Sequence, residues 1–453
     1  MTTIPARLGA ALLLLLVAAA PAAAQPTLTL ERAIEIALAN NPGIGVADAA
    51  VEVAAAGVQE AAAQRWPRAQ VEETFFRTTN PVFVFGNLLG QEAFGPQHFD
   101  PAFLNQPPEL NNWNSRLSVT QPLWTGGRIA RGLAAARQAG VAAEADRERS
   151  RERVIHDVIG AYTGAVLAAS QLDVAREALE TARAHTKLVS DLRQAELVVQ
   201  SDVLQAQVRE SEMDETVIRA ESGLAIARAA LNAALGRDLD EPYELPRDVA
   251  VELPAEPDLE RLTGQALQQR SDLRAAGARE RAAAEMVRVA RGSYLPEVGA
   301  SGMYEANAED FIGADGSNWS VAVAARWTLF DASATRARVR RAVAEERQAE
   351  RMRSGLELQA GLEVRQAYHE LRAARERVAR AHRAAELARE GLRIVEDRYR
   401  EGLTTLVELL AAQTALSESR MREVAARRDV LLADAALKLA VGSLTADMAG
   451  AGR

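Results

Sequence analysis

The side chains that could carry chemistry in this chain are carboxylates and a few histidines, because its 453 residues include 62 Asp and Glu, five His and no Cys. The pair His369–Glu370 begins like a helical zinc motif, but Ala373 occupies the place of the second zinc-binding histidine. No nucleophile elbow, phosphate-binding loop or dinucleotide fingerprint is found. Four histidines lie in Ala/Arg/Glu-rich helical patterns that predict solvated surfaces: His156, His185, His369 and His382. We therefore expect no enzyme, no metal and no cofactor.

Two acidic residues are notable for their spacing. Asp202 and Glu408 are 206 residues apart, and each follows a break between two long helical patterns. If several copies of the chain surround one passage, these side chains form a ring of carboxylates that attracts cations and can hold a constriction closed. The alternative is that they are helix N-terminal acids, placed where they favour the helix macrodipole.

The spacing of 206 residues belongs to an internal repeat. Trp113 matches Trp319, and the register holds without a gap from Asn112 to Gly236. Upstream the spacing is 229, so the first copy carries 23 extra residues, which lie in the Phe- and Pro-rich stretch 80–110. The predicted organisation is a first copy at 25–236, a Pro-rich linker at 237–257, a second copy at 258–442 and a tail at 443–453.

Long helices dominate the predicted structure. Aromatic residues make up only 4% of the chain, and the patterns at 128–194 and 335–400 contain no proline. At ~1.5 Å per residue each pattern corresponds to a helix on the order of 100 Å long. The patterns break at 195–202 and 401–408, where Gly402 can end one helix and Ser201 or Thr404 can cap the next. Two shorter helices and two strands precede each long helix.

The strands carry an apolar face. From Trp319 to Leu329 the odd positions are mostly apolar and the even positions small or polar, and the strand beginning at Trp113 alternates with the same parity. Such alternation over ~10 residues with aromatic ends fits a lipid-facing barrel strand, or a half-buried soluble hairpin. In the barrel interpretation Arg116 and Arg326 point into the lumen.

The N-terminus predicts export. Arg7 precedes the apolar run AALLLLLVAAA, and a small-residue site follows, so residues 1–24 fit a cleaved signal peptide. No later apolar run suggests a transmembrane helix. Four strands cannot close a membrane barrel, so several copies have to share one: two give eight strands with a packed interior, and three give twelve with a passage. The net charge of −9 disfavours nucleic acid as a partner.

Four stretches resemble the outer-membrane efflux protein family, the TolC-like channel tunnels of Gram-negative bacteria: LTLERAIEIALANNP, SVTQPLWTGGR, ELVVQSDVLQAQ and YREGLTTLVELLAAQ. The resemblance implies a mostly α chain that also contributes to a membrane β-barrel. It implies a homotrimer with a twelve-strand barrel in outer-membrane lipid and a twelve-helix tunnel across the periplasm. The implied partners are a periplasmic adaptor (membrane fusion protein) and an inner-membrane RND or ABC transporter. The implied role is a passive exit duct for small molecules or proteins.

The resemblance also implies roles for particular residues. The gate candidates are Asp202, Glu408 and Tyr399, and the adaptor-contacting tip candidates are Gly402, Leu403, Thr404, Glu196 and Leu197. The elbow between barrel and tunnel is expected at Gly126, Gly127 and Asp331. The chain departs from the family pattern where Glu196 replaces a tip glycine, where Ala411 replaces a second acid, and where FDAS replaces a Gly-Gly turn.

Three alternatives stay open at the level of sequence. The loop at 80–110 is either a folded-in cap that narrows the exit or a self-packed surface loop. The whole chain could instead be a periplasmic adaptor, which would have one helical hairpin flanked by β-rich modules. It could also be an exported coiled-coil structural protein, which would lack alternating strands.

Overall fold

The computed structural model describes residues 27–246 and 258–445; the predicted signal peptide, residues 247–257 of the linker and the last residues of the tail lie outside the described part. The first copy contains α1 (Leu30–Asn40), α2 (Pro42–Ala63), β1 (Arg68–Thr78), α3 (Pro81–Gly90), the 3-10 turn η1 (Pro96–Phe99), α4 (Pro101–Asn105), β2 (Leu110–Trp124), α5 (Arg128–Gln194) and α6 (Gln200–Leu235). The second contains α7 (Leu259–Gln269), α8 (Ser271–Gly292), β3 (Glu297–Ala308), β4 (Gly316–Arg326), α9 (Ala334–Arg400) and α10 (Leu406–Val441).

The two copies have the same architecture, which confirms the predicted duplication. The long helices α5 and α9 each have 67 residues, and the returning helices α6 and α10 each have 36. The difference lies between the strands, where only the first copy inserts α3, η1 and α4. A soluble hairpin or a single-hairpin adaptor does not have this doubled order of helices and strands.

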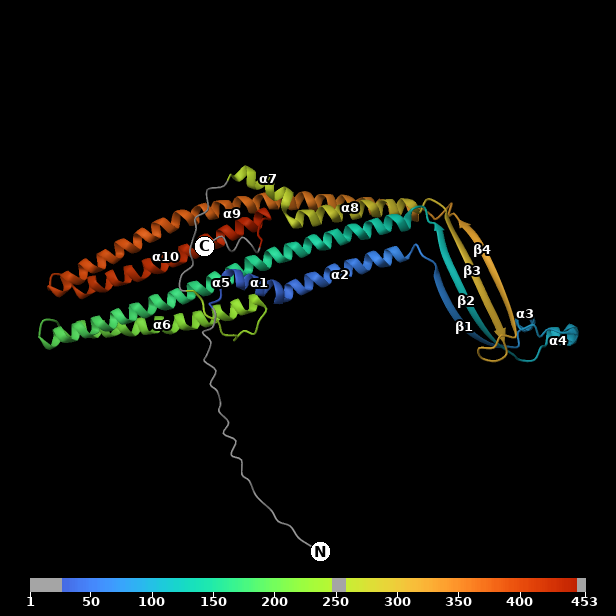
Figure 1. Ribbon diagram of the computed structural model, residues 1–453, viewed down its shortest axis with the longest axis horizontal. Coiled ribbons are helices and arrows are strands. Elements are labelled where there is room, and N and C mark those ends of the chain that lie inside the picture. The colour runs from blue at the N-terminus through green and yellow to red at the C-terminus, as the bar shows by residue number, and fades with distance from the viewer. Residues whose placement is uncertain (1–26, 247–257, 446–453) are drawn as a thin grey trace, which may run out of the picture.

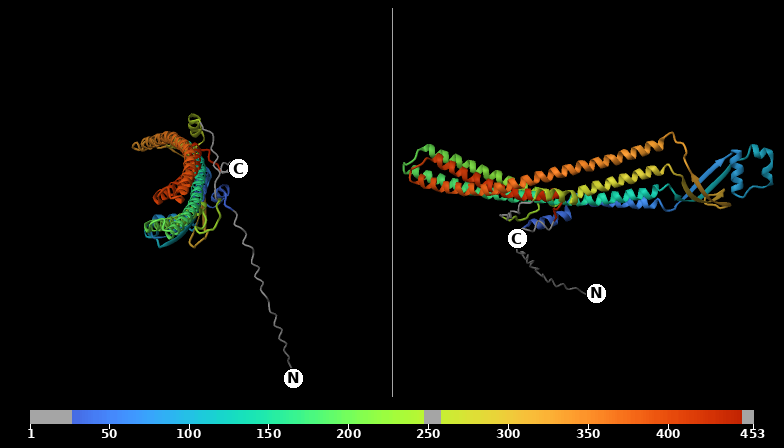
Figure 2. Two further views of the ribbon diagram at one scale, coloured as in Figure 1. Left: turned by 90° about the vertical axis from the view of Figure 1, so that its left-hand side faces the viewer. Right: turned by 90° about the horizontal axis from the view of Figure 1, so that it is seen from above.

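The molecule is elongated, with the sheet at one end and the tips of two helical hairpins at the other (Figure 1). The hairpins are α5 with α6 and α9 with α10. Seen along its length, the helical part is a curved wall rather than a closed bundle (Figure 2). A curved wall leaves both of its edges and both of its faces exposed.

The main core lies where the hairpins meet the shorter helices. Val158 and Tyr162 of α5 pack with Leu231 and Leu235 of α6 and with α1, and the Tyr162 hydroxyl donates to the Leu28 carbonyl at 2.9 Å. Burial raises the pKa of Tyr162 to about 12. Among the described helices, α5 contains a window apolar enough to cross a membrane by length and composition, although none was expected, and 50% of that window is buried. We attribute its apolar character to this core.

The four strands form one antiparallel sheet in the order β1-β2-β3-β4. In register, Arg116 of β2 lies between Glu72 of β1 and Glu305 of β3. The strand predicted to run to Leu329 ends earlier, at Arg326, where its pairing with Glu297 begins β3. Within the described residues, the outer edges of β1 and β4 have no strand partner.

A buried ionic cluster joins the two copies near the middle of the molecule. Arg270, only 1% exposed, forms a bidentate pair with Asp272 at 2.7 and 3.0 Å, and bonds Glu363 at 2.6 Å and the Ala440 carbonyl at 3.2 Å. Arg149 of α5 lies 3.7 Å from the same Asp272 carboxylate. The cluster therefore ties α5, α8, α9 and the end of α10 together.

Candidate gate, groove and lumen surfaces

The hairpin tips have the same backbone in both copies. Glu196 and Gly402 occupy equivalent positions with positive φ values of 58° and 72°. The next amide closes each turn: Leu197 N donates to the Leu192 carbonyl, and Leu403 N to the Arg398 carbonyl, both at 2.9 Å. Glu196 therefore keeps the tip geometry of a glycine, and both leucines are left exposed.

The predicted caps of the returning helices are wrong. Val199, not Ser201, is the N-cap of α6 and offers no side-chain bond. Thr405, not Thr404, caps α10 by accepting from the Glu408 amide at 3.4 Å. The N-caps lie one or two residues from the predicted positions. The residue in the left-handed region, and not the first hydroxyl, sets where the chain reverses and hence where the next helix begins.

The structure brings two of the three gate candidates together. Tyr399 of α9 is 7% exposed and packs among apolar residues of both hairpins, and its buried hydroxyl has no hydrogen-bond partner in the described chain. Burial, followed by the negative charge of Asp202, raises the pKa of Tyr399. Asp202 is half-buried in the first turn of α6, whereas Glu408 is exposed in the first turn of α10. Tyr399 and Asp202 are therefore neighbours from different hairpins.

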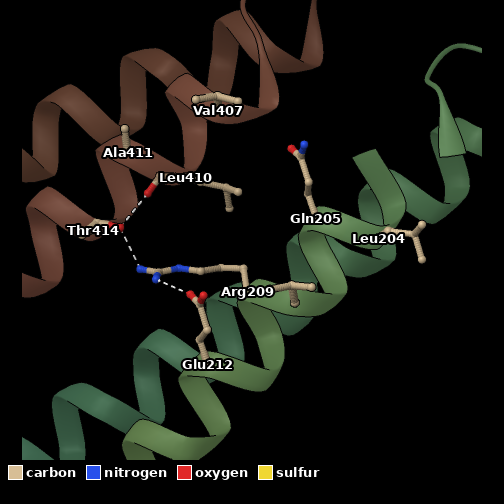
Figure 3. Close-up of a pocket in the computed structure, with 9 residues that line it drawn as sticks. Leu204, Gln205, Arg209, Glu212, Val407, Leu410, Ala411 and Thr414 are labelled. Atoms are coloured by element: carbon tan, nitrogen blue, oxygen red, sulfur yellow. Dashed lines mark hydrogen bonds and ion pairs between the residues drawn. The ribbon is translucent and has the colours of Figure 1, made fainter. Parts of the chain in front are cut away.

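A groove separates α6 from α10 just behind the tips (Figure 3). It has a volume of about 550 Å³, and its walls are Leu204, Gln205, Val208, Arg209 and Glu212 of α6 with Val407, Leu410, Ala411 and Thr414 of α10. Arg209 donates to Thr414 at 2.7 Å and to Glu212 at 3.0 Å, so its charge is satisfied within the groove. The groove was not predicted, although Leu204 and Val208 are one helical turn apart and could have indicated it.

The two faces of the sheet differ in chemistry. One face carries exposed apolar side chains in adjacent strands: Val71, Leu117, Tyr304 and Trp319. The opposite face carries Arg116, which pairs with Glu305 at 3.3 Å, and Arg326, which is exposed. A soluble protein would cover the apolar face, and no described element covers it.

Comparison with known proteins gives the family. Residues 33–237 and 262–443 match the family described as outer membrane efflux protein. The chain belongs to the outer membrane efflux protein family. Its relatives include Protein CyaE of Bordetella pertussis, which is 32% identical over 292 residues, covering 64% of this chain and 62% of the length of CyaE. The alignment thus spans less than two thirds of that relative.

Solved channels share the whole architecture. The outer-membrane channel OprN is 25% identical with a TM-score of 0.76, covering 92% of this chain and 90% of OprN. The Campylobacter jejuni outer membrane channel CmeC is 18% identical with a TM-score of 0.79, covering 91% of this chain and 85% of CmeC, and this similarity concerns the fold alone. Together with the family match, these structures confirm the predicted family, the mostly helical fold with its small sheet and the outer-membrane location of this efflux protein.

The elbow of the efflux protein uses the same backbone in both copies despite different residues. Gly126 and Gly127 have φ values of 63° and 81°, and their equivalents Ala332 and Ser333 have 50° and 70°. Asp331 accepts the Thr335 amide at 2.7 Å, and a hydrogen bond with the Thr335 side chain, followed by this amide bond, lowers the pKa of the Asp331 carboxyl. The aspartate thus satisfies an amide in the first turn of α9, whose N-cap is Ser333, at a turn where glycines are missing.

Glycine substitutions at the elbow are expected to have opposite effects in the two copies. Gly126→Ala would place a methyl group 2.5 Å from the Gly292 carbonyl oxygen and should cost about 2 kcal/mol or more of stability. Ala332→Gly relieves a left-handed alanine and should stabilise by about 0.5–1 kcal/mol. Gly127→Ala, which meets nothing within 4 Å, is the control for strain without a clash. Thermal melts of the purified protein followed by circular dichroism would measure all three.

One histidine does not lie where it was predicted. His185 is 11% exposed rather than solvated, and its Nε2 lies 3.6 Å from Glu396 of α9. Burial lowers the pKa of His185 against the opposing effect of Glu396. His369 and Glu370 are exposed, and the described residues contain no group of three or more His, Cys, Asp or Glu arranged to hold a metal ion.

Proposed function

We propose that three copies of this efflux protein assemble into the exit duct of a tripartite efflux or type I secretion system. The observation that carries the proposal is the four-stranded sheet, which has an exposed apolar face and two unpaired edges. An unpaired strand edge in lipid leaves backbone N–H and C=O groups without partners, at several kcal/mol each. Pairing β4 of one copy with β1 of the next removes every edge, and three copies give twelve strands and a passage.

The helical edges support the same assembly. Exposed apolar side chains follow both edges of the wall: Met352, Leu358, Leu387 and Ile394 on α9, and Val46, Val53, Ile218 and Ile226 on α2 and α6. The edge formed by α9 continues from β4, and the edge formed by α2 leads into β1. Neighbouring copies in a ring would therefore cover both edges at once.

The assembly is tested by the mass of the detergent-solubilised protein. We expect slightly less than three times the chain mass of 48.7 kDa by light scattering corrected for detergent, because the predicted signal peptide is removed. A monomer or a dimer would contradict the proposal. The native protein should also fractionate with outer membranes and require detergent for extraction.

Within this assembly the gate is proposed at the tips. Three copies place six carboxylates, from Asp202 and Glu408, around one axis. The buried, unpartnered hydroxyl of Tyr399 beside Asp202 supports this role, because a donor in that position can bond a carboxylate of the closed ring. The groove between α6 and α10 is proposed as the seat of a helical segment of the periplasmic adaptor.

Removing a ring carboxylate is expected to loosen the gate. Glu408→Ala should raise single-channel conductance in planar bilayers by about two-fold or more, and Asp202→Ala should act in the same direction. Cells carrying either variant should also become more sensitive to large antibiotics. Glu401→Ala, which removes an exposed acid from the tip turn outside the proposed ring, is the matched control. Conductance that is unchanged in both ring variants would rule out the carboxylate gate.

A further inference from the structure

The segment between β1 and β2, residues 79–109, is a folded unit, which we call the outer loop. Its phenylalanines contact one another: the rings of Phe85 and Phe94 are 4.7 Å apart, and those of Phe94 and Phe99 are 5.1 Å apart. The His98 ring lies 4.8 Å from Phe103, which brings α4 into the same cluster. The self-packed loop of the sequence analysis is therefore present, and its shape is fixed by its own side chains.

A buried set of amides fastens the outer loop to the sheet. Gln91, which follows α3, donates to the side-chain oxygen of Asn112 at 2.8 Å. Asn112 in turn donates to the Asn307 side chain at 2.9 Å, and Asn114 donates to the same oxygen at 3.0 Å. All four amide side chains are buried. Amides buried without partners would be costly, so this set specifies one seat for the loop.

The seat lies on the polar face of the sheet. Asn112 and Asn114 alternate in β2 with the same parity as Arg116, and Asn307 pairs with Asn114. The loop approaches so closely that a methyl group added to Gly316 would lie 2.3 Å from the Gly90 carbonyl oxygen. By contrast, the ring of Phe311, in the turn between β3 and β4, packs edge-to-face against Trp113 of the apolar face, with the ring centroids 4.8 Å apart. The two connections therefore fold toward opposite faces.

We propose that the outer loop is a lid that narrows the outer mouth of the passage and sets the size of solute that can cross it. This inference rests on the proposed function, in which the polar face lines the lumen of a shared barrel. Three copies then bring three lids to one mouth. Exposed Val82, Phe83 and Leu89 of α3 give the narrowing an apolar surface, which disfavours bulky hydrated solutes more than small ones.

The absence of cysteine from the natural chain permits a direct test. Ser301→Cys places a thiol at an exposed position of the polar face, further along β3 from Asn307, opposite Thr120. Intact cells are treated with a maleimide on a long polyethylene glycol chain or with a small charged methanethiosulfonate. Replacing residues 79–109 by the short turn 309–315 should raise labelling of this thiol by the bulky maleimide roughly ten-fold. Labelling by the small methanethiosulfonate should change by no more than about two-fold.

Point variants test whether the position of the outer loop matters when its size is unchanged. Gln91→Ala removes the side chain that anchors the loop and should also raise labelling of Ser301→Cys by the bulky maleimide. Gln97→Ala changes an exposed glutamine of the same loop and should not raise it. Asp310→Cys in the β3–β4 turn reports whether this end of the sheet is outside the cell. If it labels while Ser301→Cys labels equally with and without the loop, the lid is overturned alone. If Asp310→Cys stays unlabelled on intact cells, the proposed function fails and the lid fails with it.

Discussion

Val407→Asp is expected to stop export through the assembled tunnel while leaving the trimer intact. Val407 is 65% exposed on one wall of the groove, and Leu204 is 53% exposed on the other. The only cation of the groove, Arg209, is already paired within it, so an aspartate introduced beneath a docked helix would be desolvated without a partner. A penalty of about 3 kcal/mol weakens adaptor binding roughly 100-fold.

The measurement is co-purification of the adaptor with tagged efflux protein, together with export or drug susceptibility in cells lacking the native copy. Leu204→Asp should give the same loss from the opposite wall. Leu239→Asp changes an exposed leucine beyond the end of α6 and should leave binding and export unchanged. If export survives Val407→Asp and Leu204→Asp combined, the adaptor docks elsewhere.

The repetitive parts of this fold could be predicted because their signals are periodic. Alternation placed Arg116 and Arg326 on one face of the sheet, and the spacing of 206 residues gave Asp202 and Glu408 equivalent positions, which lie in the first turns of α6 and α10. Alternation and repeat spacing are each supported by many residues, so a single residue that departs from the pattern does not change the prediction. The positive φ of Glu196 also follows from its repeat position, since Gly402 adopts the same conformation.

The parts that could not be predicted depend on contacts between distant residues. Gln91 meets Asn112 and Asn307 only because the outer loop folds back over the sheet, and no local pattern marks those amides. His185 looked solvated because its own helix is polar, yet Glu396 of the other hairpin covers it. Burial of this kind is a tertiary property, which helical periodicity within one segment does not report.

Arg270 is the clearest case of a residue whose role the sequence concealed. Its equivalent in the first copy, at the spacing of 229, is Asn41, which donates to the Ala234 carbonyl at 2.8 Å. Arg270 makes the matching bond to Ala440 and adds ion pairs with Asp272 and Glu363. The second copy thus has a charged clamp where the first copy has a neutral one, at the point where the second copy packs against α5.

Arg270→Met is therefore expected to be among the most damaging single changes to the stability of the chain. It leaves the Glu363 carboxylate without its cation and the Asp272 carboxylate with only Arg149, 3.7 Å away, beside a buried seam, at a cost of about 3–5 kcal/mol. The double variant Arg270→Asn/Asp272→Asn removes the Asp272 charge together with the cation, while Glu363 stays charged, and should recover part of the loss. Arg380→Met, which breaks an exposed pair with Glu376, should change stability by no more than about 0.5 kcal/mol.

The same cluster predicts how acid acts on the protein. Burial alone would raise the pKa of Asp272, but the hydrogen bonds and charge of Arg270 outweigh burial and lower it. A carboxyl whose pKa is lower in the folded state contributes stability above its unfolded pKa of about 4, and this stability is lost as the pH falls through the folded value. The melting temperature should therefore fall more steeply between neutral pH and about pH 3 for the natural chain than for Arg270→Asn/Asp272→Asn. Equal acid sensitivity of the two proteins would show that the seam does not depend on the ionised aspartate, and that Arg270 acts through packing and its bonds to Glu363 and Ala440.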